Sequence, residues 1–222
     1  MVRAPTVDRP LDEAEWRRFV SAQRFGHLVA AGAARDLAVV MPTPYVLDAD
    51  CVLAHCAAGN ELFDALAEND RATLAVAGDS AFVPSSWKAI DDEDPRLGIP
   101  TYYYAAVQLS GRTEVVDDPE ALCALLLRQL GEFQPDVDVA DPLAAHRSKL
   151  RSIRGLVLHI DDVGARFKFG GNVDLAHRRS VLERLVERGS PGDADAAAHV
   201  RARVSGFQDS AFRRPSAPAP EA

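Results

Sequence analysis

Short apolar runs of strand length, separated by turn-forming residues, constrain the fold of this chain more than any other feature. Five of them precede residue 90, with glycine, aspartate or asparagine between them. They cover Gly26–Ala31, Ala38–Val46, Cys51–His55, Thr73–Ala77 and Ala81–Val83. Two longer stretches, Thr101–Val116 and Gly155–Phe169, alternate apolar and polar residues as strands do. Several short strands joined by tight turns, with a long closing strand, predict a small β-barrel.

Helices are expected around this barrel. Residues 11–22 form an amphipathic pattern, with Leu11, Trp16, Phe19 and Val20 on the apolar side. Further helices are predicted from Asn60 onward, over 118–132, 142–152 and 174–188, and on to about Val204. The fold class is therefore α+β, a barrel with peripheral helices. We expect one domain over residues 1–205, followed by a disordered tail over 206–222 that ends rich in proline and alanine.

Composition excludes several classes of function. The 222 residues carry a formal net charge of −8 and no block of lysine and arginine, which argues against direct nucleic-acid binding. No apolar run approaches the roughly 20 residues of a membrane span, and the charged N-terminus has no secretory pattern. The three cysteines lack paired spacing, so we expect reduced thiols in a cytoplasmic protein.

Common catalytic motifs are missing from the sequence. There is no Gly-x-Gly-x-x-Gly after a strand, no P-loop, no Gly-x-Ser-x-Gly elbow and no paired Cys/His zinc pattern. The chain has only three lysines, Lys88, Lys149 and Lys168, among many arginines. Each lysine is of interest, because burial can move the pKa of an amine and a guanidinium cannot replace it in that role.

Five segments, in order, resemble the PaiB-like, flavin-binding split-barrel family. They are Arg24–Val29, Ala54–Asn60, Phe82–Trp87, Ile99–Val107 and Phe167–Asn172. The resemblance implies an α+β split β-barrel that forms a homodimer, with flavin mononucleotide (FMN) bound between the subunits.

The chain also departs from that family's pattern. Where the family has an arginine after its His-x-Ala element, this chain has Ala58, and Glu61 replaces a proline. Arginine is the natural bidentate clamp for a phosphate, so its loss weakens the case for FMN. Tyr102–Tyr104 replaces the family's Trp-Asn-Tyr, and Lys168–Asn172 reads Lys-Phe-Gly-Gly-Asn instead of Lys-Leu-Ser-Gln-Asn.

The C-terminal segment is similar to the piperazate synthase branch of the same superfamily, whose members bind haem b. The similarity lies in Phe167–Asn172, the helix from Asp174 and the turn Arg188–Asp193. It implies a haem-dependent enzyme that cyclises L-N5-hydroxyornithine to L-piperazic acid, forming an N–N bond with loss of water. No external reductant is needed for that stoichiometry.

Under this resemblance, His55 is the expected axial ligand of the iron. It precedes the small residues Ala57, Ala58 and Gly59, which allow a porphyrin to approach the backbone. The alternative is a structural histidine that hydrogen-bonds the turn. His27 is the second candidate ligand. His146, His177 and His199 lie on charged helical stretches and are expected to be solvated, and His159 is expected to be an ordinary strand histidine.

Lys168 is the expected catalytic residue. It could bind a haem propionate or the substrate carboxylate, or act as a base toward the substrate amine. The alternative is a solvated ammonium whose methylene stem packs on the barrel.

Expected cofactor contacts are His55, Gly59, Asn60, Trp87, Lys88, Tyr102, Tyr104 and Lys168. Tyr103 opposes Tyr102 and Tyr104 across the strand, and which face lines the pocket stays open. Trp87 could stack on the cofactor or pack as a plain aromatic. The acidic loop, Asp91, Asp92, Glu93 and Asp94, is solvated or recognises cationic groups of the substrate.

Two other functions compete with the synthase. One is a PaiB-type FMN protein, either a flavin reductase or a transcriptional regulator. The other is a haem-binding protein without catalytic activity.

Overall fold

The computed structural model describes residues 4–140 and 142–205. Its strands are β1 (Phe25–Ala30), β2 (Val39–Pro44), β3 (Val46–Asp48), β4 (Cys51–Ala57), β5 (Arg71–Val83), β6 (Thr101–Val116) and β7 (Ile153–Lys168). Its α-helices are α1 (Glu13–Gln23), α2 (Glu61–Glu68), α3 (Pro119–Phe133), α4 (Pro142–Leu150), α5 (Leu175–Arg188) and α6 (Asp193–Ser205). Short 3₁₀ turns cover Thr6–Asp8 (η1), Ser85–Lys88 (η2) and Pro95–Leu97 (η3). The α+β class expected from the sequence is confirmed.

The strands form one seven-stranded sheet in the order β2-β1-β5-β6-β7-β4-β3. The pairs β1–β2, β1–β5, β3–β4 and β4–β7 are antiparallel. Along β6, Tyr103, Ala105, Val107 and Leu109 are all at most 1% exposed, whereas the residues between them are not buried. This is the period of two expected of a strand with one buried face.

The chain divides into two compact units. Among the described residues, unit 1 covers 4–78 and Ala105–Phe167, and unit 2 covers Asp79–Tyr104 and 168–205. Strands β5, β6 and β7 run through both, so the prediction of a single domain over residues 1–205 stays a prediction. The predicted tail over 206–222 lies outside the described residues.

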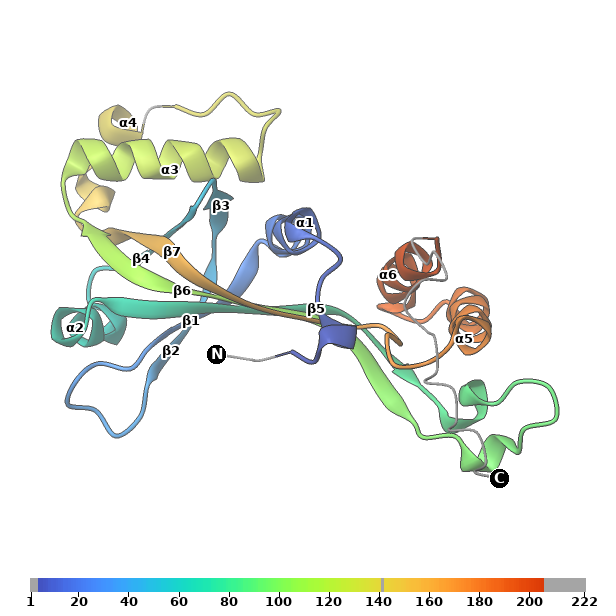
Figure 1. Cartoon of the computed structure of the whole chain (residues 1–222). Coiled ribbons are helices and arrows are strands. Elements are labelled where there is room, and N and C mark those ends of the chain that lie inside the picture. Colours follow the sequence, from blue (N-terminus) through green and yellow to red (C-terminus); the bar gives the residue numbers. More distant parts are fainter. Residues whose placement is uncertain (1–3, 141, 206–222) are drawn as a thin grey trace. The chain divides into compact units, whose positions relative to one another are not determined.

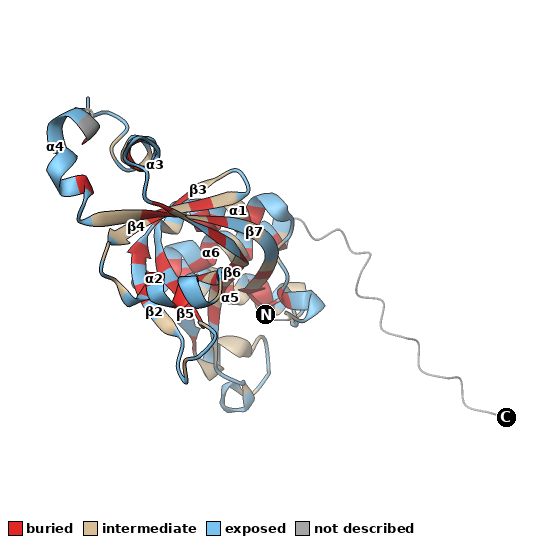
Figure 2. Ribbon diagram, turned by 90° about the vertical axis from the view of Figure 1, so that its left-hand side faces the viewer, coloured by how far each residue is buried: buried red, intermediate tan, exposed pale blue. Residues whose placement is uncertain are grey.

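In unit 1, helices α3 and α4 lie side by side and cover part of the sheet (Figure 1). Their buried leucines form a cluster with Val116, against which Leu53, Ile153 and Val157 of β4 and β7 pack. Elsewhere α4 is largely exposed. Figure 2 shows buried residues both on the strands and on helices. This packing puts the inner face of α3 against β4, which positions the first candidate site.

Side-chain caps explain where the helices begin. The carboxylate of Asp12 accepts a hydrogen bond from the Glu15 N–H at the start of α1, and Asp118 accepts two at the start of α3. Asn60 caps α2 and Asp174 caps α5 in the same way. Each cap satisfies backbone donors that have no partner within their own helix.

Two strand predictions are wrong in detail. Ala38–Val46 is not one strand, because Tyr45 separates β2 from β3: its N–H bonds the Arg24 carbonyl at 3.1 Å and its hydroxyl donates to the Val20 carbonyl at 2.6 Å. Conversely, the two runs at Thr73–Ala77 and Ala81–Val83 are one strand, β5. Asp79, at φ 49°, adopts a left-handed backbone that the strand continues through.

No helix in the described part of the chain is both long enough and apolar enough to cross a membrane.

Candidate functional site

His55, the expected iron ligand, lies on β4 in unit 1 with its imidazole half-buried. Its Nδ1 is 2.6 Å from Oε1 of Gln129, which projects from α3 and is 2% exposed. The Gln129 Nε2 donates to the backbone carbonyl of Leu53, two residues before His55, at 3.0 Å. A buried amide thus joins the helix to the strand that carries the histidine.

This geometry fixes the tautomer of His55. A carbonyl oxygen only accepts, so the amide of Gln129 must turn its NH₂ to Leu53 and its oxygen to His55. Nδ1 of His55 must then carry a proton, so Nε2 is the nitrogen that can offer a lone pair. Histidines that bind metals show this arrangement, with one nitrogen held by an outer partner and the other on the metal. The residues at His55 therefore fit an iron that takes one axial imidazole.

The turn that follows His55 leaves room for a cofactor at Gly59, but its Asn60 side chain is already engaged. Gly59 has open space, since a Cβ there would meet nothing within 4 Å. Ala58 is small and apolar, and its backbone N–H donates to the Ser152 carbonyl at 2.9 Å. The side chain of Asn60 caps α2 by accepting from the Leu62 N–H at 2.9 Å. A cofactor that hydrogen-bonded the side-chain oxygen of Asn60 would compete with this helix cap.

His27, the second candidate ligand, lies on β1 and lines a cavity of about 450 Å³ in unit 1. Small residues, among them Gly26, Ala75 and Ala106, share that lining. Among the described residues, no hydrogen-bond acceptor holds its ring as Gln129 holds His55. The geometry of the outer partner therefore favours His55.

Unit 2 contains a cavity of about 850 Å³ that brings together two of the three lysines. Lys88, at the end of η2, and Lys168, the last residue of β7, both line it, with Thr101 and Tyr103 of β6. Asp174 and His177, at the start of α5, line it as well. Two expected site residues that lie 80 positions apart in the sequence thus share one cavity.

The two lysines have different surroundings. The Lys168 ammonium donates to the Thr101 hydroxyl at 2.7 Å. The Lys88 ammonium lies 5.4 Å from the centre of the Tyr103 ring, and no carboxylate in the described residues pairs with it. Burial, and then the charge of Lys168, lower the pKa of Lys88 from its ordinary value. Burial therefore acts on the amine of Lys88, which the sequence predicts only as a cofactor contact.

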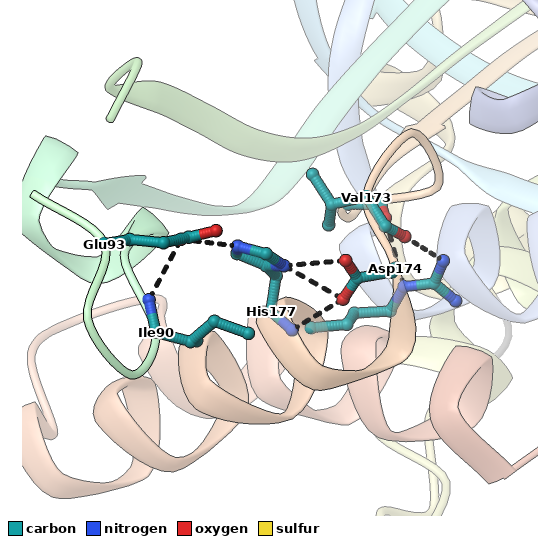
Figure 3. A network of polar contacts seen from close by, with 7 residues as sticks. Ile90, Glu93, Val173, Asp174 and His177 are labelled. Atoms are coloured by element: carbon teal, nitrogen blue, oxygen red, sulfur yellow. Dashed lines mark hydrogen bonds and ion pairs between the residues drawn. The ribbon is translucent and has the colours of Figure 1, made fainter. Parts of the chain in front are cut away.

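Beside this cavity, His177 joins two carboxylates (Figure 3). Its Nδ1 is 2.9 Å from both Asp174 oxygens, and its Nε2 is 3.0 Å from the Glu93 carboxylate of the acidic loop. Hydrogen bonds to Asp174 and to Glu93 raise the pKa of His177. The expectation of a solvated His177 is wrong, because its side chain is 18% exposed and paired on both nitrogens. Glu93 is likewise engaged within the protein.

The predictions for the other histidines have mixed outcomes. His199 is not solvated: it bonds Asp79 at 2.9 Å and stacks on Phe169 with ring centres 4.4 Å apart. His146 is exposed, as expected. His159 is half exposed on β7, where its Nδ1 lies 3.3 Å from the Cys51 sulfur.

A buried arginine holds the segment that follows Lys168. Arg178 of α5 is 3% exposed and donates to three backbone carbonyls. These are Gly170 at 3.0 Å, Val173 at 2.8 Å and Arg203 at 3.2 Å. Gly170 itself requires glycine, since it adopts φ 75° and a Cβ would lie 2.5 Å from the Tyr103 hydroxyl.

The three tyrosines of β6 separate as the alternation predicts, and the structure identifies the buried face. Tyr103 is 1% exposed and Tyr102 is 55% exposed. The Tyr103 hydroxyl is buried and has no hydrogen-bond partner among the described residues, and burial raises its pKa to about 12. It is Tyr103, not Tyr102 or Tyr104, that lines the cavity with the lysines. Trp87 has one face covered by the Arg188 guanidinium, 4.5 Å from its ring centre.

Sequence reasoning missed Gln129 and Tyr103. Gln129 lies on an amphipathic helix 74 residues from His55, and no local pattern marks it. The signal available was a glutamine on the side of the helix that otherwise carries leucines.

The described residues contain no group of three or more His, Cys, Asp or Glu side chains placed to hold a bare metal ion. A haem iron does not need one, since the porphyrin supplies four ligands.

Comparison with known proteins identifies the family. Residues 4–162 match the family described as "Putative FMN-binding domain". The chain is 22% identical to "Protease synthase and sporulation protein PAI 2" of Bacillus subtilis (strain 168) over 179 residues, which cover 78% of this chain and 84% of that protein.

Two solved structures show the same fold. The flavocytochrome Anf3 from Azotobacter vinelandii matches with a TM-score of 0.57 at 17% identity, covering 76% of this chain and 73% of that one. The FAD and haem binding protein from Mycobacterium smegmatis also matches with a TM-score of 0.57 at 17% identity, covering 73% and 74%. The split-barrel fold predicted from the sequence is confirmed, and with most of its length matched by the family model the chain belongs to the PaiB-like family of FMN-binding split barrels.

Proposed function

We propose that this protein is a haem b-dependent cyclase that converts L-N5-hydroxyornithine to L-piperazic acid. In this proposal His55 is the axial ligand and Lys168 is the catalytic residue. The homodimer and the cytoplasmic location expected from the sequence are part of the proposal.

The observation that carries the proposal is the hydrogen-bonded pair His55–Gln129. Gln129 holds the proton on Nδ1 of His55 and leaves the Nε2 lone pair available. A flavin needs no such nitrogen donor, whereas a haem iron does. An imidazole held this way by a buried amide supports iron ligation over the alternative of a histidine that only braces the turn.

The residue at position 58 supports haem over FMN as well. Ala58 stands where the family resemblance places an arginine, and an alanine side chain has no group to hold a phosphate. Haem carries no phosphate and does not require that clamp.

The proposed reaction is balanced without a further reactant. The α-amine nitrogen attacks the δ-nitrogen, the N–O bond breaks, and one water leaves as the six-membered ring closes. Bound haem would supply a Lewis acid that makes the hydroxylamine oxygen a better leaving group. In this step a neutral Lys168 amine, or a water that it orients, would accept the proton that the α-amine loses, and that proton would pass to the departing hydroxyl so that it leaves as water. The Thr101 hydroxyl, 2.7 Å away, holds the Lys168 nitrogen in place.

The first test is the absorption spectrum of protein expressed with a haem precursor. We expect a Soret band, together with conversion of N5-hydroxyornithine to a product lighter by one water and without added reductant. Flavin bands, or no chromophore after haem addition, would contradict the proposal and favour the FMN-type protein. A Soret band without turnover would favour the non-catalytic haem-binding protein.

Substitution of Gln129 tests the outer partner of His55. Gln129→Leu has a similar side-chain volume but lacks the oxygen that accepts from His55 Nδ1. We therefore expect haem affinity to fall about 10- to 100-fold. Gln129→Glu keeps an acceptor near Nδ1 and should retain haem. It should also lower the iron reduction potential, because a carboxylate makes the imidazole a stronger donor. The measurements are haem titration and potentiometry. Equal haem affinity in wild type and Gln129→Leu, with both folded by circular dichroism, would show that Gln129 has no such role.

A further inference from the structure

The unit 2 cavity has an excess of positive charge. Lys88, Lys168 and His177 line it, and Asp174 is the one carboxylate among its lining residues. Lys88 is half-buried and its ammonium has no hydrogen-bond acceptor or carboxylate partner in the described part of the chain. A partly buried ammonium without an acceptor is costly unless a ligand supplies the counter-charge.

The nearby carboxylates are not available to Lys88. Both oxygens of Asp174 contact the His177 ring, and one of them also accepts the His177 N–H at 3.0 Å. Glu93 accepts from His177 and from the Ile90 N–H at 3.1 Å. Figure 3 shows both carboxylates directed at the same imidazole. Both carboxylates are thus engaged with His177, and neither forms an ion pair with Lys88 among the described residues. The charge of Lys88 is left for a ligand.

The remaining walls suit a short aliphatic chain. Ile99, Val173 and the ring of Tyr103 line the same cavity as Lys88. Tyr103 is fully buried at the wall, and its ring lies under the Lys88 ammonium. The cavity thus offers one cationic end and an apolar side, which matches a small carboxylate that carries a chain of methylene groups.

We propose that Lys88 binds the α-carboxylate of an amino-acid substrate in this cavity, with Ile99, Val173 and Tyr103 against its methylene chain. The identity of the substrate as an ornithine derivative rests on the proposed function, whereas the carboxylate site rests on the cavity alone. Lys88 is then a specificity-determining residue. Lys168, held by Thr101, keeps the catalytic role that the proposed function gives it.

The test uses full-length purified protein with lysine labelled with ¹³C at Cε. With three lysines in the chain, the spectrum contains three signals to follow as the pH is raised. We expect L-ornithine to move the titration of Lys88 to higher pH, because a carboxylate favours the charged ammonium. Lys149, exposed on α4 in unit 1, should not respond. The probe 1,4-diaminobutane, which is ornithine without its carboxylate, should leave Lys88 unchanged.

The second measurement is the affinity of the protein for L-ornithine. Lys88→Gln should weaken L-ornithine binding by calorimetry about 10- to 100-fold, the range for a lost hydrogen bond to a charged group. Lys149→Gln is the matched control and should bind as wild type. Unchanged affinity in Lys88→Gln would overturn the assignment.

Other outcomes separate this inference from the proposed function. If Lys88 responds to ornithine in protein that takes up no haem, the carboxylate site stands and the haem proposal fails. If Lys88 already titrates at an ordinary or higher pH in haem-loaded protein and ignores ornithine, a haem propionate holds it and the amino-acid assignment is wrong. A response to inorganic phosphate but not to ornithine would equally overturn it, in favour of a flavin phosphate.

Discussion

His55→Ala is expected to abolish the Soret band and all cyclisation of N5-hydroxyornithine. The substitution removes the nitrogen that Gln129 leaves unprotonated, and no other side chain on β4 offers an imidazole. Loss of an outer partner costs roughly 10- to 100-fold in metal affinity, so loss of the ligand itself should cost at least about 100-fold. Haem titration and product analysis measure both effects.

His27→Ala is the matched control for this substitution. His27 is also on a strand of unit 1 and lines a cavity, but no buried amide orients its ring within the described residues. It should keep haem and turnover. Added imidazole should partly restore the Soret band in His55→Ala, since the truncated side chain leaves room for it. The reverse pattern, with haem lost in His27→Ala and retained in His55→Ala, would move the ligand assignment to β1.

Gly111→Ala is expected to have the largest effect on stability. A Cβ at Gly111 in β6 would lie 1.7 Å from the backbone oxygen of His159 in β7, far inside van der Waals contact. Neither atom belongs to a flexible side chain, so the two paired strands must move apart. We expect a loss of about 3 kcal/mol or more, the upper end for overpacking. In thermal denaturation this is a fall on the order of 10 °C.

Gly131→Ala provides the control in the same unit. Gly131 lies in α3, and a Cβ there would meet nothing within 4 Å. Because glycine weakens a helix relative to alanine, this substitution should raise stability by up to about 1 kcal/mol. If Gly111→Ala melts within a degree or two of wild type, the close approach of β6 and β7 is not as tight as described.

Local patterns were sufficient for most of the secondary structure. The alternation through Thr101–Val116 predicts β6 with its observed ends, and the amphipathic pattern from Leu11 predicts α1. Predictions failed where a tertiary contact overrides the local signal. Tyr45 splits one apolar run because its hydroxyl reaches the Val20 carbonyl, and nothing near Tyr45 in the sequence indicates that contact.

The candidate sites show the same limit. His55 and the lysines could be selected from the sequence by residue type and by resemblance. Their partners could not, because Gln129 meets His55 only through the packing of α3 on β4. His177 and His199 were expected in solvent for the same reason. Their helices carry many charges, and only the tertiary fold shows that Glu93 and Asp79 face those rings. The contact of His177 with Asp174 is local, three residues away at the start of α5.

Arg178 has a consequence for how the end of the chain unfolds. Its guanidinium bonds carbonyls in the turn after β7 and at Arg203, near the end of α6, so α5, α6 and that turn share one set of buried bonds. Segments tied in this way open together in native-state hydrogen exchange, with one free energy of local opening. Val173, Asp174 and His177 belong to the same segment. A chain cut short before Arg203 would lose one of the three Arg178 bonds, and with it part of the support for this wall of the lysine cavity.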